Sequence, residues 1–515
     1  MSNFSRRQFV MLMSAAAAGT AVAPMGLLNA RRAIAQGTCN TASFTVPGFG
    51  TPTPKLPNNT KSLGAFANIP LITLPDKFQY TAISIRGDVM SDGAIVPGNH
   101  DGMAAFQGRS GNYILVRNHE RSIGGSGTIA PNGKEYDSFT GGSKGGGTTT
   151  VEVDRNGQVV RHYVSLAGTI RNCAGGLTPW GSWISSEENV AIPTVGLQGY
   201  DARVTKKHGY NFEVPAELGQ AVDPIPLVAM GRMNHEAVSV DPQSGYIFET
   251  EDRGDSAYYK FVPKVGKPNK FGDLQRGGDL YAMVIKPGQR SDCTGALIPT
   301  GGTNDRGGSF RGVDTRGLGA NGSGSLLPFL GQPLRVEWVK LDDVDPAEDT
   351  LRYEALAKGA AVWYRGEGAW YHQGKHYWVC SNAGDAAEGQ VWAYDPRTET
   401  VTLVVESTSE NLLDGPDNIT VARDGTLYLC EDGSEGTQGA PNASQRVIGV
   451  DASGGLFEFC RNIIPAGVSG NNAEFAGACF SQNGKYMYVN SQGGGITYCI
   501  WRTDNRSIAL NGATA

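Results

Sequence analysis

Asp424-Gly425-Thr426-Leu427-Tyr428-Leu429-Cys430-Glu431-Asp432 contains the pattern that decides the fold. Asp-Gly before a run of aliphatic and aromatic residues is typical of a tight hairpin turn followed by a strand. A second apolar run lies just upstream, at residues 418–421. The stretch therefore predicts an antiparallel hairpin with carboxylates at the end of its second strand.

The same pattern returns along the chain: a turn, four or five apolar or aromatic residues, and a polar or acidic end. The further copies occupy residues 110–120, 180–189, 245–252, 374–382 and 483–490. Short apolar runs between the copies, such as 390–394 and 456–459, supply outer strands. Repeated four-stranded units of this kind predict an all-β fold, a six-bladed β-propeller with insertions.

The N-terminal residues have the features of an export signal. Ser5-Arg6-Arg7-Gln8-Phe9-Val10 is a twin-arginine pattern, an apolar stretch follows, and Ala33-Ile34-Ala35 resembles a cleavage site. An uncleaved membrane anchor is the alternative, but Pro24 interrupts the stretch. We expect a twin-arginine signal peptide over 1–35, export by the twin-arginine machinery, and a periplasmic or secreted protein without a membrane anchor.

Residues 36–515 are then expected to form a single β-propeller catalytic domain, with a Gly-rich insertion around 253–359 that includes a short helix at 347–358. The chain has 515 residues with 71 glycines, 44 Lys and Arg against 50 Asp and Glu, and a formal net charge of −6. No basic stripe is present, so the composition argues against a nucleic-acid partner.

The acidic ends of the repeats are the main functional signal. Inner strands of a propeller converge on a central channel, so side chains at matching positions face one another there. Carboxylates gathered in this way repel unless a cation neutralises them, although a ring of solvated rim charges is the alternative. Side chains alternate along a strand, so Glu187 and Glu188 point the same way only if a bulge intervenes.

Several stretches resemble the PhoX family of secreted, metal-dependent alkaline phosphatases. The most specific is Asn172-Cys173-Ala174-Gly175-Gly176-Leu177-Thr178-Pro179-Trp180-Gly181. The other matching stretches are 118–120, 187–189, 234–237, 365–370, 414–419 and 430–433. Longer family members have Arg-Pro-Glu-Trp where this chain has 365–370, and Cys where it has Ser186, which indicates a shorter relative.

The resemblance implies a six-bladed propeller that holds a mixed, oxo-bridged cluster of Ca²⁺ and Fe³⁺. It implies that Cys173 ligates iron, since soft sulfur suits iron better than calcium. A disulfide is the alternative fate of a lone thiol, and Cys460, Cys479 and Cys499 are further candidates for one. The expected metal ligands are Cys173, Glu120, Glu187, Glu188, Glu236, Glu251, Glu367, Asp417, Asn418 and Glu431.

The expected catalytic residues are Arg365, Glu367 and Asn118. Arg365 precedes Glu367 by two residues, so both face the same side of a strand, and the planar guanidinium fits phosphate oxygens. A plain salt bridge to Glu367 is the alternative. We therefore expect a monomer that hydrolyses small-molecule phosphate monoesters. The rival hypotheses are a calcium-dependent lactonase or esterase propeller and a non-enzymatic calcium-binding propeller.

Overall fold

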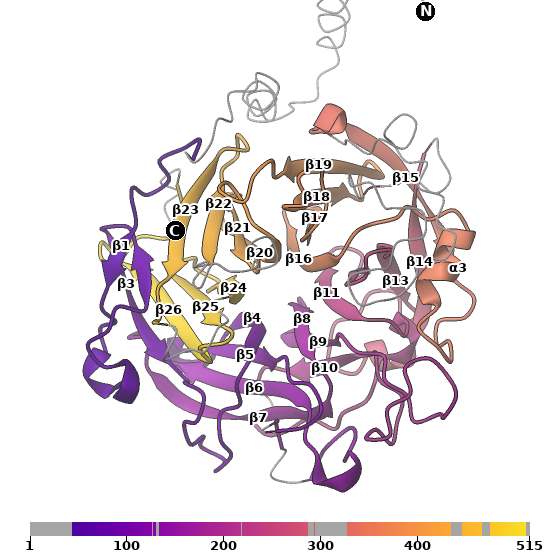
Figure 1. The fold of residues 1–515 in the computed structure, drawn as a ribbon, viewed down its shortest axis with the longest axis horizontal. Coiled ribbons are helices and arrows are strands. Elements are labelled where there is room, and N and C mark those ends of the chain that lie inside the picture. The colour runs from indigo at the N-terminus through magenta and orange to yellow at the C-terminus, as the bar shows by residue number, and fades with distance from the viewer. Residues whose placement is uncertain are drawn as a thin grey trace, which may run out of the picture.

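The structure is a computed structural model that describes residues 44–510, apart from 126, 130–132, 218, 287–292, 294–326, 434–444 and 466–473. The predicted signal peptide at 1–35 and the Gly-rich run at 317–324 lie outside the described residues. Strands dominate the described part, and they stand around a central axis (Figure 1). The predicted all-β, propeller-like fold is thus confirmed.

Two sheets are formed by strands that follow one another in the chain, as expected for meanders of short strands. The first consists of β4 (His100–Gln107), β5 (Tyr113–His119), β6 (Gly146–Val153) and β7 (Val159–Thr169). The second consists of β8 (Asn172–Leu177), β9 (Ser182–Glu187) and β10 (Asn211–Pro215).

A nine-stranded sheet follows. Its first part is β11 (His235–Val240), β12 (Ile247–Glu251), β13 (Tyr259–Pro263) and β14 (Gly278–Ile285). Its second part is β16 (Gly366–His372), β17 (Lys375–Cys380), β18 (Gln390–Asp395) and β19 (Thr400–Glu406). Strand β15 (Pro333–Lys340) joins the two parts, because it pairs with β14 through Lys340 and with β19 through Pro333.

The expected insertion at 253–359 is therefore more regular than the glycine content indicated. Its described part supplies β13, β14 and β15 to this sheet, and it contains helix α3 (Leu351–Ala357), near the position predicted for a helix. The remaining helical turns are η2 (Thr60–Ser62), η3 (Gly64–Phe66), η4 (Arg109–Gly111), η5 (Thr140–Gly142), η6 (Val228–Met230), η7 (Leu274–Arg276) and η9 (Leu327–Phe329).

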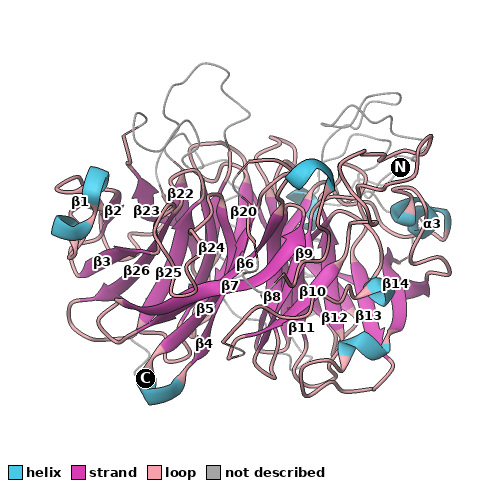
Figure 2. Ribbon diagram, turned by 90° about the horizontal axis from the view of Figure 1, so that it is seen from below, coloured by secondary structure: helices cyan, strands magenta, loops and turns pink. Residues whose placement is uncertain are grey.

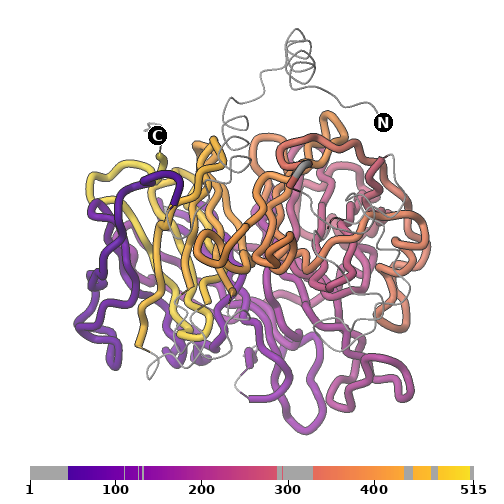
Figure 3. Tube along the Cα trace, turned by 45° about the horizontal axis from the view of Figure 1, so that its top comes forward, coloured from indigo at the N-terminus to yellow at the C-terminus, as the bar shows by residue number. Residues whose placement is uncertain are grey.

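The last two sheets combine both ends of the described chain. One contains β20 (Pro416–Val421), β21 (Leu427–Glu431), β22 (Arg446–Val450) and β23 (Leu456–Asn462), extended by β2 (Ile72–Leu74) and β1 (Thr53–Lys55). The other contains β24 (Phe475–Phe480), β25 (Tyr486–Ser491), β26 (Ile496–Arg502) and β3 (Phe78–Ile83). Strand β3 pairs antiparallel with β26, so an N-terminal strand completes the C-terminal sheet, as the adjacent indigo and yellow segments show (Figure 3).

The first strands of these units lie side by side around the centre. Strand β4 contacts β8 and β24, β11 contacts β8 and β16, and β20 contacts β16 and β24. Apolar side chains also fill the space between the two parts of the nine-stranded sheet, where Tyr258, next to β13, and Trp378 of β17 stack with ring centroids 4.0 Å apart. Seen from the side, the inner strands run roughly parallel to the axis (Figure 2), so their starts meet at one end of the centre.

Candidate metal centre

Each innermost strand begins with an irregularity. The register against the second strand shifts at His100/Met103, Asn172/Gly175, His235/Val238, Gly366/Ala369, Pro416/Asn418 and Ala476/Cys479. A β-bulge of this kind bends the strand and redirects side chains. The residues near these bulges include Asp101, Cys173, Glu236, Glu367 and Asp417, so local backbone geometry places four carboxylates and a thiol at the start of the central strands.

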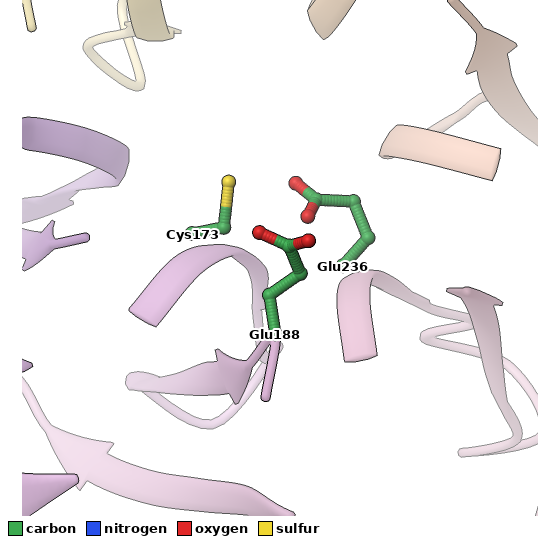
Figure 4. Close-up of side chains that lie close together, drawn as sticks. All are labelled: Cys173, Glu188 and Glu236. Carbon is green, nitrogen blue, oxygen red and sulfur yellow. The ribbon is translucent and has the colours of Figure 1, made fainter. Parts of the chain in front are cut away.

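Two overlapping groups of these side chains are close enough to share a cation. Ligand atoms of Cys173, Glu188 and Glu236 all lie within 4.8 Å of one another, and their side chains point toward one another (Figure 4). Ligand atoms of Glu236, Glu367 and Asp417 lie within the same limit. Glu236 belongs to both groups, so the two share a central carboxylate.

Glu236 is the least compensated carboxylate of the centre. Its side chain is fully buried, and neither carboxylate oxygen has a hydrogen-bond partner among the described residues. Burial raises the pKa of Glu236 well above its ordinary value, and the charges of Glu367 and Asp417 raise it further. A buried carboxylate without donors is costly, and coordination of a cation would remove that cost.

The thiol of Cys173 faces a carboxylate. Its Sγ lies 3.6 Å from Oδ2 of Asp101, which belongs to the neighbouring strand β4. Burial raises the pKa of Cys173 well above the ordinary thiol value, and the charges of Asp101 and Glu236 add to the effect. The thiolate form therefore requires a positive partner in this position.

Glu367 and Asp417 have partial compensation. Ser381 donates its hydroxyl to Glu367 Oε1 at 3.0 Å, and Arg365 Nη2 lies 3.2 Å from the same oxygen. Burial raises the pKa of Glu367 well above its ordinary value, and that of Asp417 to about 6, in both cases against the opposing charge of Arg365. Asn418 donates its amide to Asp417 Oδ2 at 2.7 Å.

Arg365 is held by several groups. Its Nε donates to Asp252 Oδ1 at 3.0 Å and its Nη1 donates to Asn382 Oδ1 at 2.7 Å. The predicted pairing of Arg365 with Glu367 is thus present, although Arg365 precedes strand β16 and has a positive φ of 49°. The guanidinium lies between the carboxylates of the centre and a neutral amide.

A second arginine contacts the other side of the cluster. Nη2 of Arg171 lies 2.6 Å from Glu120 Oε1 and 2.6 Å from Glu188 Oε2. Glu120 also accepts a hydrogen bond from the side-chain amide of Gln492, at 3.1 Å. The structure thus brings Glu120 and Glu188 into the same polar network.

One backbone hydrogen bond recurs at the starts of β4, β8, β11, β16, β20 and β24. The residue after each second strand donates its N–H to the carbonyl of the residue just before the first strand of the same hairpin. The pairs are Glu120 to Asn99, Glu188 to Arg171, Asp252 to Asn234, Ser381 to Arg365, Asp432 to Gly415 and Gln492 to Glu474. This bond fixes the end of each hairpin next to the bulge residues of its first strand.

Sequence reasoning missed Asp101 and Glu474. Asp101 is fully buried, and Gln492 donates its amide to Asp101 Oδ2 at 2.9 Å and to Glu474 Oε1 at 3.1 Å. A signal for Asp101 was present, because residues 99–102 (Asn-His-Asp-Gly) match residues 234–237 (Asn-His-Glu-Ala). Residues 118–120 carry the same Asn-His-Glu sequence as 234–236, but they lie at the end of a second strand.

Other predicted ligands have different partners. Glu187 accepts hydrogen bonds from Ile170 N, His208 Nδ1, Gly209 N and Tyr210 N. Glu251 accepts from Tyr259 and lies near Arg352, whereas Glu431 accepts two bonds from the guanidinium of Arg446. Of the adjacent pair, Glu188 therefore reaches the centre and Glu187 faces His208.

Asn118 and Asn418 support the backbone of the centre. Asn118 donates its amide to the carbonyls of Cys173 (3.0 Å) and Ala174 (2.5 Å), and its oxygen accepts from Trp183 and Ser185. Asn418 Oδ1 accepts the N–H of Gly477 at 2.8 Å. The cysteines Cys173, Cys380, Cys430, Cys460, Cys479 and Cys499 are all buried and free, so the suggested disulfide among the last three is wrong.

The donor set fits metal binding. Several buried carboxylates supply the hard oxygens that calcium prefers, and the single thiol supplies a softer ligand. Arg171 and Arg365 lie at the edge of the cluster, and the buried acidic groups outnumber these two positive charges. The fold and this site together define a β-propeller with a buried, acidic centre at the starts of its inner strands.

Comparison with known protein families identifies the family to which this propeller belongs. The sequence profile described as "Alkaline phosphatase PhoX" matches residues 59–495, and the chain belongs to that family. No curated protein sequence matches the chain. The chain is therefore an enzyme of the alkaline phosphatase type, a phosphoesterase.

A solved PhoX structure has the same fold. PhoX from Pseudomonas fluorescens, in complex with the transition-state analogue vanadate, is 16% identical with a TM-score of 0.58, over 86% of this chain and 98% of that chain. A gluconolactonase from Xanthomonas campestris is 10% identical with a TM-score of 0.36, over 90% and 99% of the two chains. A TM-score this low supports no conclusion about the present chain. Among the described residues, no helix is long and apolar enough to span a membrane.

Proposed function

We propose that this protein hydrolyses phosphate monoesters at a metal cluster in the centre of the propeller. The observation that carries the proposal is Glu236: a fully buried carboxylate, shared by two potential ligand groups, whose oxygens have no hydrogen-bond partner in the described part of the chain. Membership of the PhoX family supplies the reaction class.

A count of six blades is part of the proposal. The recurring hydrogen bond between hairpin ends, found at β4, β8, β11, β16, β20 and β24, supports one blade for each of these strands. In this interpretation β15 is an additional strand that connects two neighbouring blades, and β3 completes the last blade.

The residues that would hold the metals are Asp101, Cys173, Glu188, Glu236, Glu367 and Asp417, with Glu120 at the edge. The oxygen-rich part suits Ca²⁺, and the part around Cys173 suits Fe³⁺. Bound metal ions would neutralise the substrate phosphate and polarise its P–O bonds.

The protein side chains have distinct roles in this proposal. Arg365 would bind phosphate oxygens through its planar guanidinium, while Asp252 and Asn382 hold it in orientation. Asn118 would act as a positioning residue, because it binds the carbonyls of Cys173 and Ala174. Removal of one preorganised charge-stabilising group typically costs about 10²–10³ in rate.

The remaining expectations also stay proposals. Export by the twin-arginine machinery would deliver the folded protein to the periplasm or the medium, and we propose a monomer that acts on small phosphate esters. Residues 1–35 supply the motif for export.

Metal analysis and a visible spectrum of the purified protein, combined with p-nitrophenyl phosphate hydrolysis, test the central proposal. We expect bound calcium and iron, a thiolate-to-iron absorption band, and loss of activity on chelation that calcium restores. Full activity after verified removal of the metals would contradict a metal mechanism, whereas bound calcium without phosphatase activity would favour a binding propeller.

A further inference from the structure

Arg171 occupies the same place in its repeat as Arg365. Each arginine lies two residues before a side chain of the centre, Cys173 and Glu367 respectively. Both arginines have left-handed backbone conformations, with φ of 50° and 49°. Such conformations are uncommon for residues other than glycine, asparagine and aspartate, and they concentrate at functional sites.

The hydrogen bonds of the two arginines also correspond. The N–H of Arg171 donates to the carbonyl of Arg121 at 3.0 Å, and the N–H of Arg365 donates to the carbonyl of Arg253 at 2.8 Å. Arg121 and Arg253 each follow an acidic residue, Glu120 and Asp252, at the end of the preceding hairpin.

That acidic residue is in turn a side-chain partner. Arg171 contacts Glu120 of the preceding hairpin and Glu188 of its own hairpin. Arg365 contacts Asp252 of the preceding hairpin and Glu367 of the strand that it precedes, β16. Each guanidinium group therefore binds one acid of the preceding hairpin and one acid of its own, although the second acid follows the second strand for Arg171 and lies in the first strand for Arg365.

Arg171 still has donors to offer. Its Nη2 binds both carboxylates, whereas its Nε has no hydrogen-bond partner among the described residues. The side chain of Arg171 is 28% exposed, while that of Glu188 beneath it is 3% exposed. The side chain of Arg171 is thus the more accessible member of this ion pair, and we expect a phosphate ester to approach the centre from its side.

We propose that Arg171 is a second arginine that contacts the phosphoryl group of the substrate, together with Arg365. This inference rests on the proposed phosphatase function. The terminal phosphate of a monoester has three unesterified oxygens, so it can contact the metal centre and both arginines at once. A diester has one fewer, so Arg171 favours monoesters over diesters.

Arg171→Asn is the test variant. Asn99 holds the corresponding position of another repeat with a φ of 50°, so asparagine is compatible with this backbone. We expect kcat/KM for p-nitrophenyl phosphate to fall about 10²-fold, with a much smaller loss for bis-p-nitrophenyl phosphate. Calorimetric titration with inorganic phosphate is expected to show weaker binding, and metal content to stay as in the wild type.

Arg121→Asn is the matched control, because it removes a neighbouring arginine whose recorded side-chain bond goes to Asn99 Oδ1. We expect near-wild-type activity from it. Unchanged monoester activity in Arg171→Asn, an equal loss on both substrates, or an equal loss in the control would overturn the inference. Loss of metal in Arg171→Asn would also overturn it and make Arg171 a support for Glu188. Absence of phosphatase activity in the wild type would instead refute the proposed function.

Discussion

The Sγ atom of Cys173 lies 3.6 Å from Oδ2 of Asp101, and the two side chains come from the adjacent central strands β8 and β4. The thiol is thus next to a buried acid of a neighbouring sheet. Both groups have pKa values raised first by burial, and each is surrounded by further acids. Only a cation in contact with both would allow both to be ionised at neutral pH.

Cys173→Ser is expected to lose iron and the associated visible absorption, since a hydroxyl is a poor substitute for a thiolate ligand. Asp101→Asn is expected to lower the metal content while the fold remains. Cys499→Ser, a change at a buried cysteine in strand β26, is the control and should keep its metals. Metal analysis and absorption spectra check all three, and an unchanged spectrum in Cys173→Ser would rule out thiolate ligation.

Arg365→Lys and Glu367→Gln are expected to fail in different ways. Lysine keeps the charge but loses the planar fork, so metal content should persist while kcat falls about 10²–10³-fold. Glu367→Gln removes a carboxylate from one of the potential ligand groups and should lose metal. Metal content, circular dichroism and kcat separate these outcomes. Retention of kcat in the first variant and of metal in the second would reduce the pair to a salt bridge.

Gly102→Ala is expected to destabilise the centre of the propeller. A Cβ atom at Gly102 would lie 2.5 Å from Ala174 Cα and 2.8 Å from Cys173 O, both in the adjacent backbone. Overpacking of this kind typically costs about 1–3 kcal/mol. Gly366→Ala is the control, because its nearest atoms would be 3.4 Å away. Thermal unfolding of both variants tests this expectation. Equal stability of the two would show that strands β4 and β8 can move apart without a loss of stability.

His208 predicts a pH dependence of stability. Its ring is hydrogen-bonded to Glu187 Oε1 (2.7 Å) and Asp137 Oδ2 (3.2 Å), and all three side chains are buried. Burial opposes the charge, but the two carboxylates outweigh it and raise the pKa of His208 to about 9. A raised pKa stabilises the fold below the unfolded value of about 6.5, and this stabilisation is lost as the pH rises through about 9.

The stabilisation lost when His208 deprotonates amounts to about 3 kcal/mol in the free energy of unfolding. Denaturant unfolding at several pH values, compared between wild type and His208→Gln, measures it. The difference in the free energy of unfolding between the two proteins should shrink from pH 6.5 to above pH 9. A constant difference would mean that His208 is neutral in the folded protein.

The sequence was sufficient to predict the hairpins, but not the β-bulges at the starts of the inner strands. Asp-Gly and Asn-Gly turns before apolar runs predicted β21 and β25, because turn chemistry and strand pattern are local. The choice between Glu187 and Glu188 depends on how the chain leaves β9 and on His208, which is distant in sequence. Asp101 was not predicted, because its match to Glu236 appears only when the starts of the hairpins are compared with one another.

The pairing of β3 with β26 has a consequence for synthesis of the protein. The ribosome makes β3 before all the strands from β4 to β26, so the sheet that contains β3 is completed only after the intervening strands exist. Until then β3 has an unpaired edge, which invites association with other chains. A premature stop before β24 would remove the partner of β3 and one segment of the central ring together, and we expect such products to aggregate instead of forming a smaller enzyme.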